Sequence, residues 1–268
     1  MKDILVDGFS LRQRKEGFFL DEGTVLPAVA KQNTFLVTAP FMDGAVPVRA
    51  GFDSGRVVVS IVVRGEDEAV LAGRVSMLVG RLSLAKEVTR VDGDNSRCVQ
   101  VLEVDVAEPA WSAGFRSVKL KASFKVAPFW VEGVPRVGRG VPLRVGRVRL
   151  PEFDDATGKI VDAVIRLMGP FSMVELADHH GGGLIVGGAE HGESIFVDLH
   201  AWRSWKTKDP EAWEKPGETE FPEFPAGGRL ELVPSFTGQM VTTSLEIKRA
   251  VGTGKESSLT VRGSRWWM

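Results

Sequence analysis

The chain is 268 residues long, with 34 basic and 35 acidic residues, and 43% of its residues are hydrophobic. This length allows two ordinary domains or one large all-β domain, and the balanced charge excludes a generally basic nucleic-acid-binding protein. The apolar content is too high for a disordered chain, and no apolar run approaches the roughly 20 residues of a membrane-spanning helix. The composition therefore predicts a folded protein without a transmembrane helix.

Cysteine and the first residues narrow the class further. Cys98 is the only cysteine, which excludes intrachain disulfides and cysteine-based zinc sites. Residues 1–20 carry charged side chains throughout and lack the apolar stretch of a signal peptide. We expect a soluble protein that is made in a reducing compartment and folds through its core alone.

The first half of the chain contains three predicted strands. Residues 117–126 alternate apolar and polar side chains, which is typical of a strand with one buried face. Residues 56–64 are apolar on both faces and predict a central strand. Residues 97–106 predict a third strand, whose alternation is interrupted near Leu102 in a way that indicates a bulge.

Residues 67–82 predict a helix between the second and third of these patterns. Leu71, Val75, Leu78 and Leu82 form one apolar stripe at helical spacing. Acidic residues at positions 66–68 suit the positive end of the helix dipole. We therefore expect one helix packed against the strands of the first half.

A glycine-, proline- and arginine-rich stretch predicts a domain boundary. We place an N-terminal domain at 1–135, a linker at 136–145 and a C-terminal domain at 146–268. After the boundary, short apolar runs alternate with glycine-rich turns, which favours a β-sandwich. Strands are expected at 147–150, 160–167, 171–176, 195–199, 229–233, 241–250 and 259–262. The predicted fold class is mainly β: a β-rich domain with one packed helix, followed by an all-β sandwich.

All four histidines lie within one window and raise the question of a metal site. They are His179, His180, His191 and His200, and carboxylates are interspersed among them. Imidazole and carboxylate are good ligands for zinc, but this spacing matches no known site. We expect polar loop residues and no shared metal. A metal-dependent hydrolase that uses this cluster is kept as a rival.

Other candidate catalytic motifs fail on their spacing. Residues 252–257 superficially resemble a phosphate-binding loop, but Glu256 follows Lys255 where the pattern requires serine or threonine. No G-x-S-x-G nucleophile motif is present, and the acidic residues at 152–155 crowd one turn. We expect no enzymatic activity, no catalytic residue and no cofactor.

Two surfaces are candidates for protein contacts. Residues 116–149 hold nine basic residues against one acidic residue, without the interleaved aromatic side chains that a nucleic-acid stacking platform needs. The strand face of Lys119, Lys121 and Lys125 is either a solvated face or a contact surface for other protein subunits. Residues 206–226 are proline-rich and acidic, which excludes a core strand there.

The segment at 206–226 also contains large aromatic side chains. Trp213, Phe221 and Phe224 predict an arm that docks on a neighbouring protein, and an arm folded back on its own domain is the alternative. Trp202, Trp205 and His200 suggest a different function, a sugar-binding platform on the sandwich.

The first half resembles a known family. It resembles the N-terminal domain of distal tail proteins (minor tail proteins) of long-tailed, siphovirus-type bacteriophages. The segments that carry the resemblance are residues 56–65, the helix at 67–82 and the strand that includes residues 94–101. The Pro128-Phe129 pair near the end of the long strand strengthens the resemblance, whereas Cys98 replaces an aromatic residue frequent in the family. Residues 194–198 and 228–234 are similar to the galectin-like sandwich that many of these proteins carry.

This resemblance implies a structural role in a virion. A ring, usually a hexamer, would join the tail tube to the tip or baseplate, and the sandwich would decorate it. The implied partners are the tail tube protein, the tape measure protein, and the tip hub and receptor-binding proteins, with DNA only in transit through the channel. The protein would be made in the host cytoplasm without membrane insertion. The alternative is a carbohydrate-binding β-sandwich that acts in host attachment.

Overall fold

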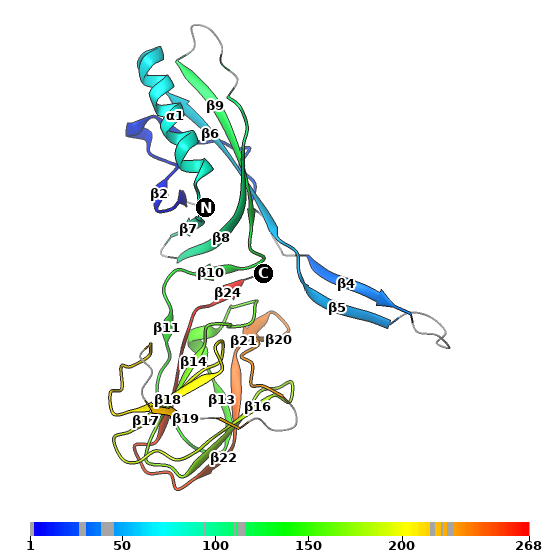
Figure 1. Ribbon diagram of the computed structural model, residues 1–268, viewed down its shortest axis with the longest axis vertical. Coiled ribbons are helices and arrows are strands. Elements are labelled where there is room, and N and C mark those ends of the chain that lie inside the picture. The colour runs from blue at the N-terminus through cyan, green and yellow to red at the C-terminus, as the bar shows by residue number, and fades with distance from the viewer. Residues whose placement is uncertain are drawn as a thin grey trace. The chain divides into compact units, whose positions relative to one another are not determined.

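The computed structural model describes residues 3–26, 31–38, 46–93, 95–109, 111, 116–214, 218–220, 222–223 and 228–267. The chain divides into two compact units, one ending at Glu132 and the other spanning Gly133–Trp267, which we call unit 1 and unit 2. Both are rich in antiparallel strands, and the described residues contain one α-helix (Figure 1). The mainly β fold class predicted from the sequence is confirmed.

Unit 1 is built on one antiparallel sheet with the strand order β2-β1-β7-β8-β9-β6-β3. Strand β10 adds to it by pairing with the start of β8. The strands are β1 (Asp3–Val6), β2 (Phe9–Ser10), β3 (Phe18–Leu20), β6 (Gly55–Arg64), β7 (Glu87–Asp92), β8 (Asn95–Val106), β9 (Ser117–Val126) and β10 (Trp130–Glu132). A short 3-10 helix, η1 (Arg14–Glu16), precedes β3.

The pairing of β6 with β9 gives this sheet its buried face. Val57 lies opposite Phe124, and Ile61 lies opposite Leu120. These four side chains are buried, as sequence alternation predicts for one face of each strand. The strands expected at 117–126 and 56–64 are both present, but the second, expected to be central, lies next to the edge strand β3.

The bulge expected in the third strand is also present. The register between β8 and β9 shifts between Val101 and Glu103. Leu102 is the extra residue at this point, and its side chain is exposed. An added residue changes which face the following side chains occupy, which explains the interrupted alternation in the sequence.

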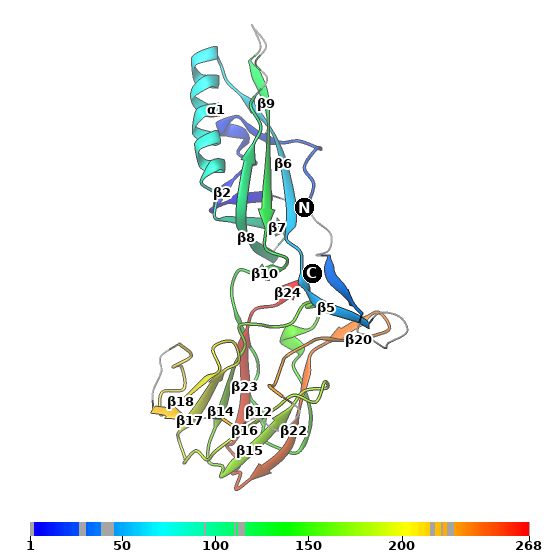
Figure 2. The ribbon, with the colours of Figure 1, turned by 45° about the vertical axis from the view of Figure 1, so that its right-hand side comes forward.

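Helix α1 (Glu68–Ser83) covers the apolar face of this sheet (Figures 1 and 2). The Asp67 side chain caps its first turn by accepting a 2.8 Å hydrogen bond from the backbone N–H of Val70. The predicted stripe is buried in full, at Leu71, Val75, Leu78 and Leu82. Within the described residues, no helix is long and apolar enough to cross a membrane.

Strands β4 (Gln32–Val37) and β5 (Val46–Phe52) form a separate two-stranded ladder in unit 1. In the described part of the chain, neither strand pairs with the main sheet. Its base is anchored by an edge-to-face contact between the rings of Phe52 and Phe129, whose centroids are 5.0 Å apart. The Asn33 side-chain amide also donates a 2.7 Å hydrogen bond to Asp53.

Unit 2 contains two antiparallel sheets that share one core. The first sheet has the order β11-β23-β14-β17-β18-β19, with β12 also paired to β23, and the second has the order β13-β22-β15-β16. The first sheet comprises β11 (Arg136–Val137), β12 (Val141–Pro142), β14 (Val164–Met168), β17 (Ser194–Asp198), β18 (Arg203–Thr207), β19 (Glu218–Glu220) and β23 (Ser258–Gly263). The remaining elements are β13 (Gly146–Arg149), η2 (Pro151–Phe153), β15 (Met173–Ala177), β16 (Gly183–Val186), β20 (Ser235–Thr237), β21 (Met240–Thr242), β22 (Ser244–Val251) and β24 (Trp266–Trp267).

Side chains from both sheets meet in a single buried cluster, which makes unit 2 a β-sandwich. Ile165 and Val197 come from the first sheet, and Leu176 and Ile247 come from the second. Leu230 is equally buried in this cluster. The strand expected at 229–233 is absent: this segment forms one isolated bridge, between Arg229 and Gly183 of β16.

The expected linker at 136–145 is not a free connection. Strands β11 and β12 lie within it, and both pair with β23. Leu143 is buried in the sandwich core. Proline and glycine interrupt the alternation so often that two-residue strands leave no recognisable period in the sequence.

The helix stripe supports a matched stability test. We expect Leu78→Ala to lower the free energy of unfolding of unit 1 by about 2–5 kcal/mol, because the fully buried side chain leaves a cavity under α1. Met77, at the neighbouring position, is 40% exposed, so Met77→Ala should lower the free energy of unfolding by about 0.5 kcal/mol or less. Urea unfolding followed by circular dichroism measures both, and equal losses would contradict the packing of α1.

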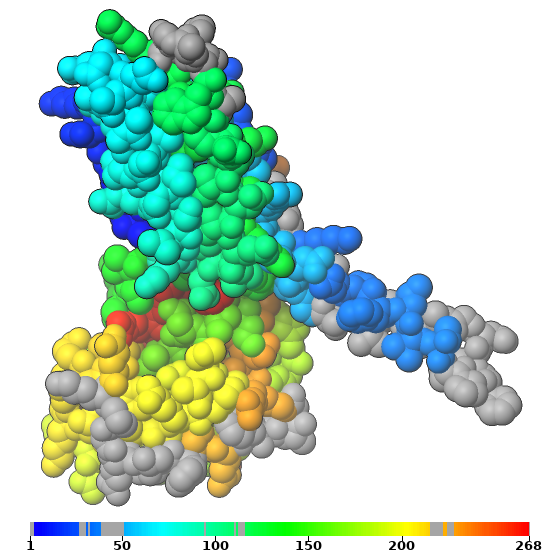
Figure 3. Space-filling view, turned by 45° about the horizontal axis from the view of Figure 1, so that its top comes forward, coloured from blue at the N-terminus to red at the C-terminus, as the bar shows by residue number. Residues whose placement is uncertain are grey.

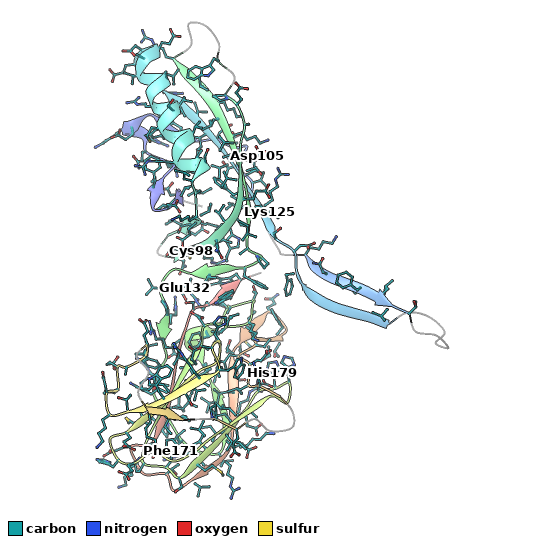
Figure 4. All side chains as sticks on the ribbon, viewed as in Figure 1. Cys98, Asp105, Lys125, Glu132, Phe171 and His179 are labelled. Carbon is teal, nitrogen blue, oxygen red and sulfur yellow. The ribbon has the colours of Figure 1, made fainter. Side chains whose placement is uncertain are left out.

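Cys98 on β8 supports a chemical test (Figure 4). Burial of the thiol and the nearby charge of Glu87 raise its pKa to about 11. At pH 8 the thiolate fraction is then about one in a thousand, against about a quarter for an unfolded chain with a pKa near 8.5.

We therefore expect thiol labelling of the native chain at pH 8 to be at least about 100-fold slower than labelling in guanidinium chloride. Because Cys98 is the only cysteine, the reaction reports on this position alone. Equal rates in the two conditions would show that the fold neither shields this half-buried thiol nor raises its pKa.

Candidate assembly surfaces

The predicted lysine face lies on β9, on the side of the sheet opposite α1. Lys119, Lys121 and Lys125 are exposed and alternate with the buried residues of the strand. Lys119 forms an ion pair with Asp21, and this contact holds the pKa of the Asp21 carboxyl below its usual range. Lys125 lies 3.8 Å from a carboxylate oxygen of Glu103. The face is therefore partly neutralised by neighbouring carboxylates.

A shallow groove of about 440 Å³ continues this face toward the start of β6. Its charged lining comes from Arg56, Glu103, Asp105 and Lys125, and Figure 4 shows Asp105 and Lys125 on the neighbouring strands β8 and β9. The Arg56 guanidinium donates a 2.6 Å hydrogen bond to the Ser123 hydroxyl across the β6–β9 ladder. Because both signs of charge are present, this surface suits a partner of mixed charge better than a polyanion.

The β4–β5 ladder exposes a run of apolar side chains that sequence reasoning missed. Phe35 is 61% exposed, Leu36 is 71% exposed, and Val37 is also exposed (Figure 3 shows the ladder in blue). Consecutive strand residues point to opposite faces, so both faces of β4 carry exposed apolar groups. An isolated two-stranded ladder is marginally stable in water. The uninterrupted run at 35–37, which does not alternate, is the signal that would have identified it.

The predicted arm falls into a described and an undescribed part. Phe221 and Phe224 lie outside the described residues. Trp213 is described and only 7% exposed. It belongs to a small cluster with Phe196, Trp205 and Ala212 on the outer side of the β17–β18 pair.

Several contacts hold this outer cluster together. The Phe196 ring stacks on Trp205 at 5.4 Å and meets Trp213 edge to face at 5.2 Å. The Trp205 indole N–H donates a 2.9 Å hydrogen bond to the carbonyl oxygen of Ala212. The Arg166 guanidinium lies over Trp213 and donates to the carbonyl of Pro210 at 2.6 Å. The placement of Trp213 corresponds to the alternative of an arm folded on its own domain.

The four histidines lie in three separate turns of unit 2, with His179 and His180 adjacent in one of them. The rings of His179 and His180 lie 4.0 Å apart beyond β15 (Figure 4 labels His179), and partial desolvation, together with the charge of His180, lowers the pKa of His179. His191 pairs with Glu256 at 3.2 Å, and His200 follows β17. Among the described residues, no three metal-ligating side chains come together.

The buried carboxylate among these residues has a structural role. Asp178 accepts hydrogen bonds from the backbone N–H groups of His180 at 2.7 Å, Gly182 at 2.9 Å and Glu231 at 2.9 Å. These bonds stabilise the turn after β15 and tie it to the segment around Glu231. The acidic residue beside the histidines thus satisfies backbone donors.

The outer cluster generates a test of the arm. We expect Trp213→Ala to lower the stability of unit 2 by about 3–5 kcal/mol, because it removes the buried indole that covers Phe196. Trp111→Ala is the control, since Trp111 in unit 1 is exposed and should change stability little. Thermal unfolding measures both, and an unchanged melting temperature for Trp213→Ala would restore the expectation of a free docking arm.

Comparison with known proteins assigns the fold. No protein-family model and no curated protein matches the sequence. The structure is similar to the crystal structure of the SPP1 Dit protein, described as a paradigm of the hub adsorption apparatus of Gram-positive-infecting phages, with a TM-score of 0.55, 15% identity and 99% of each chain covered.

Two structures of the phage p2 baseplate in its activated conformation give lower scores. The strontium form has a TM-score of 0.39 at 8% identity, covering 98% of this chain and 97% of that one. The calcium form has a TM-score of 0.37 at 8% identity, covering 93% and 90%. The chain therefore has the mainly β fold of the SPP1 Dit protein over 99% of its length.

Proposed function

We propose that this chain is a structural subunit of a bacteriophage tail tip, in which copies of unit 1 assemble into a ring. The similarity to the SPP1 Dit protein supports this proposal, because it extends over 99% of both chains and includes both units. The ring would join the tail tube to the tip or baseplate, and unit 2 would decorate it. The number of subunits expected from the family resemblance is six.

The observation that carries the proposal is the exposed β4–β5 ladder. Its apolar side chains gain stability only when another surface covers them. A second copy of this chain is the occupant that closed symmetry supplies, since each subunit donates one ladder and receives another. Repeating the same contact around an axis leaves no ladder uncovered.

The groove beside Lys125 supports the same arrangement. Glu103 and Asp105 lie next to Arg56 and Lys125, so the surface contains both partners of a charge-complementary contact. In a ring, where neighbouring subunits meet through two different surfaces, this mixed-charge groove would contact a complementary surface of the next copy. Lys119, Lys121 and Lys125 are proposed contact residues on this basis.

The ring would place no chemistry in its centre. Its function would be mechanical: a channel for the tape measure protein and for DNA in transit, with contacts to the tail tube, tip hub and receptor-binding proteins. The proposed location is the virion tail, after synthesis in the host cytoplasm.

A paired substitution tests the ladder contact. We expect the double variant Phe35→Ser with Leu36→Ser to lose assembly by at least about tenfold in association constant, because about 1.4 kcal/mol or more of apolar burial is removed. Phe236→Ser is the matched control, since Phe236 in unit 2 has the same 61% exposure as Phe35. Native mass spectrometry of the full chain, alone and co-purified with tail tube and tip proteins, gives the subunit number.

The secondary structure of each variant should match the parent by circular dichroism, which separates lost assembly from lost folding. A parent chain that stays monomeric in both preparations would contradict the ring. Unchanged assembly of the double variant would contradict the role of the ladder.

A further inference from the structure

A pocket of about 160 Å³ opens on unit 2, between the turn that follows β17 and the segment at 229–232. Its polar lining comes from Lys159, His200, Arg229 and Glu231, and Trp202 forms an apolar wall. This volume lies below the roughly 300–1,000 Å³ of pockets for drug-sized ligands. The space therefore suits a single small ring.

The turn that carries Trp202 is held in a fixed conformation. One carboxylate oxygen of Asp198 accepts hydrogen bonds from the backbone N–H groups of His200 and Ala201, both at 2.9 Å. The other oxygen accepts from the Arg203 guanidinium at 3.3 Å. These contacts position the first wall of the pocket without using any group that faces into it.

Trp202 itself has a backbone φ of +52°, in the left-handed region. A bulky residue rarely adopts this conformation, because its Cβ crowds the backbone. Glycine would remove the strain, so the turn geometry alone does not require tryptophan. Strained backbone clusters at ligand sites, so this conformation beside a pocket points to a functional role for the indole side chain.

The opposite wall is fixed by the buried carboxylate of Asp178, which accepts a hydrogen bond from the backbone N–H of Glu231. The Glu231 side chain forms an ion pair with Lys159 at the pocket rim. The Arg229 guanidinium lies 4.5 Å from the ring centre of Trp202. The backbone of each wall is therefore fixed by a carboxylate outside the lining, Asp198 or Asp178, and the lining side chains also contact one another.

The lining combines groups that only donate hydrogen bonds with a group that only accepts them. Lysine and arginine donate, and the carboxylate of Glu231 accepts. Glu231 would repel an anion, and Lys159 and Arg229 would repel a cation. A hydroxyl group donates and accepts at once, so adjacent hydroxyls match this lining, and the apolar face of a sugar ring matches an indole.

We propose that this pocket binds one sugar residue of a glycan. Trp202 and Arg229 pack against the ring, and Lys159, Glu231 and His200 contact its hydroxyls. The sequence-based platform of Trp202, Trp205 and His200 is corrected in one respect: Trp205 is 1% exposed within the outer cluster and is closed to a ligand. This proposal is independent of ring assembly, which depends on unit 1.

The test uses the full chain and defined probes. Methyl glycosides of glucose, galactose, mannose, N-acetylglucosamine and N-acetylgalactosamine are titrated by ligand-observed NMR and by tryptophan fluorescence. We expect saturable binding of at least one glycoside. Glu231→Gln should weaken it about tenfold or more, because a charged acceptor becomes a neutral amide with one accepting oxygen while size and backbone are kept.

Trp202→Gly should abolish the binding while relieving the left-handed strain, so a folded variant is expected. The matched controls are Glu256→Gln, an exposed carboxylate of unit 2 outside the pocket, and Trp111→Gly in unit 1. Both controls should bind like the parent.

Three outcomes would overturn the proposal. The first is no saturable binding of any glycoside, and the second is binding that both pocket variants retain. The third is binding of inorganic phosphate at this pocket, lost in an Arg229→Gln variant, while every neutral glycoside fails to bind. None of these results would bear on the subunit number, so failure here is distinguishable from failure of the ring.

Discussion

The ladder between β6 and β9 sets the arrangement of unit 1. Its register places Val57, Ile61, Leu120 and Phe124 on one face of the sheet, and α1 buries that face. A slip of one residue would turn these side chains to water and bring the lysines under the helix. The lysine face is therefore a consequence of the same register that forms the core.

In unit 2, alternation along β17 places apolar side chains on both faces of the first sheet, and each face needs its own cover. Inward residues of β17, such as Ile195 and Val197, pack in the sandwich core, while Phe196 between them points outward. An outward phenylalanine needs its own cover, and the segment that carries Trp213 provides it. The proline-rich stretch after β18 thus begins as part of the fold of its own domain.

Sequence patterns predicted the parts in which local periodicity and burial agree. The stripe from Leu71 to Leu82, the alternation of β9 and the bulge at Leu102 each follow from residues adjacent in the chain. The β11 and β12 strands could not be predicted this way, because each has two residues and depends on distant β23. The burial of Trp213 likewise depends on Phe196, a contact that no local period encodes.

Of the candidate surfaces, only the one set by the period of a single strand could be predicted from sequence. The exposure of the three lysines follows from the period of one strand, whereas the unpaired β4–β5 ladder becomes visible only when the whole sheet is traced. The pocket beside Trp202 could not be predicted from sequence, because its walls depend on turns that Asp198 and Asp178 hold by hydrogen bonds. If unit 1 forms a ring, several such pockets would act together, and weak binding at each would add to avidity.

The central claim is that this chain is a ring-forming structural subunit of a phage tail tip. An electron cryo-microscopy reconstruction of the assembled tail that contains it is the most direct measurement. The account predicts copies of unit 1 around the tail axis, with each β4–β5 ladder covered by the neighbouring copy. A single copy placed away from the axis, or a ring in which Phe35 and Leu36 face solvent, would contradict it.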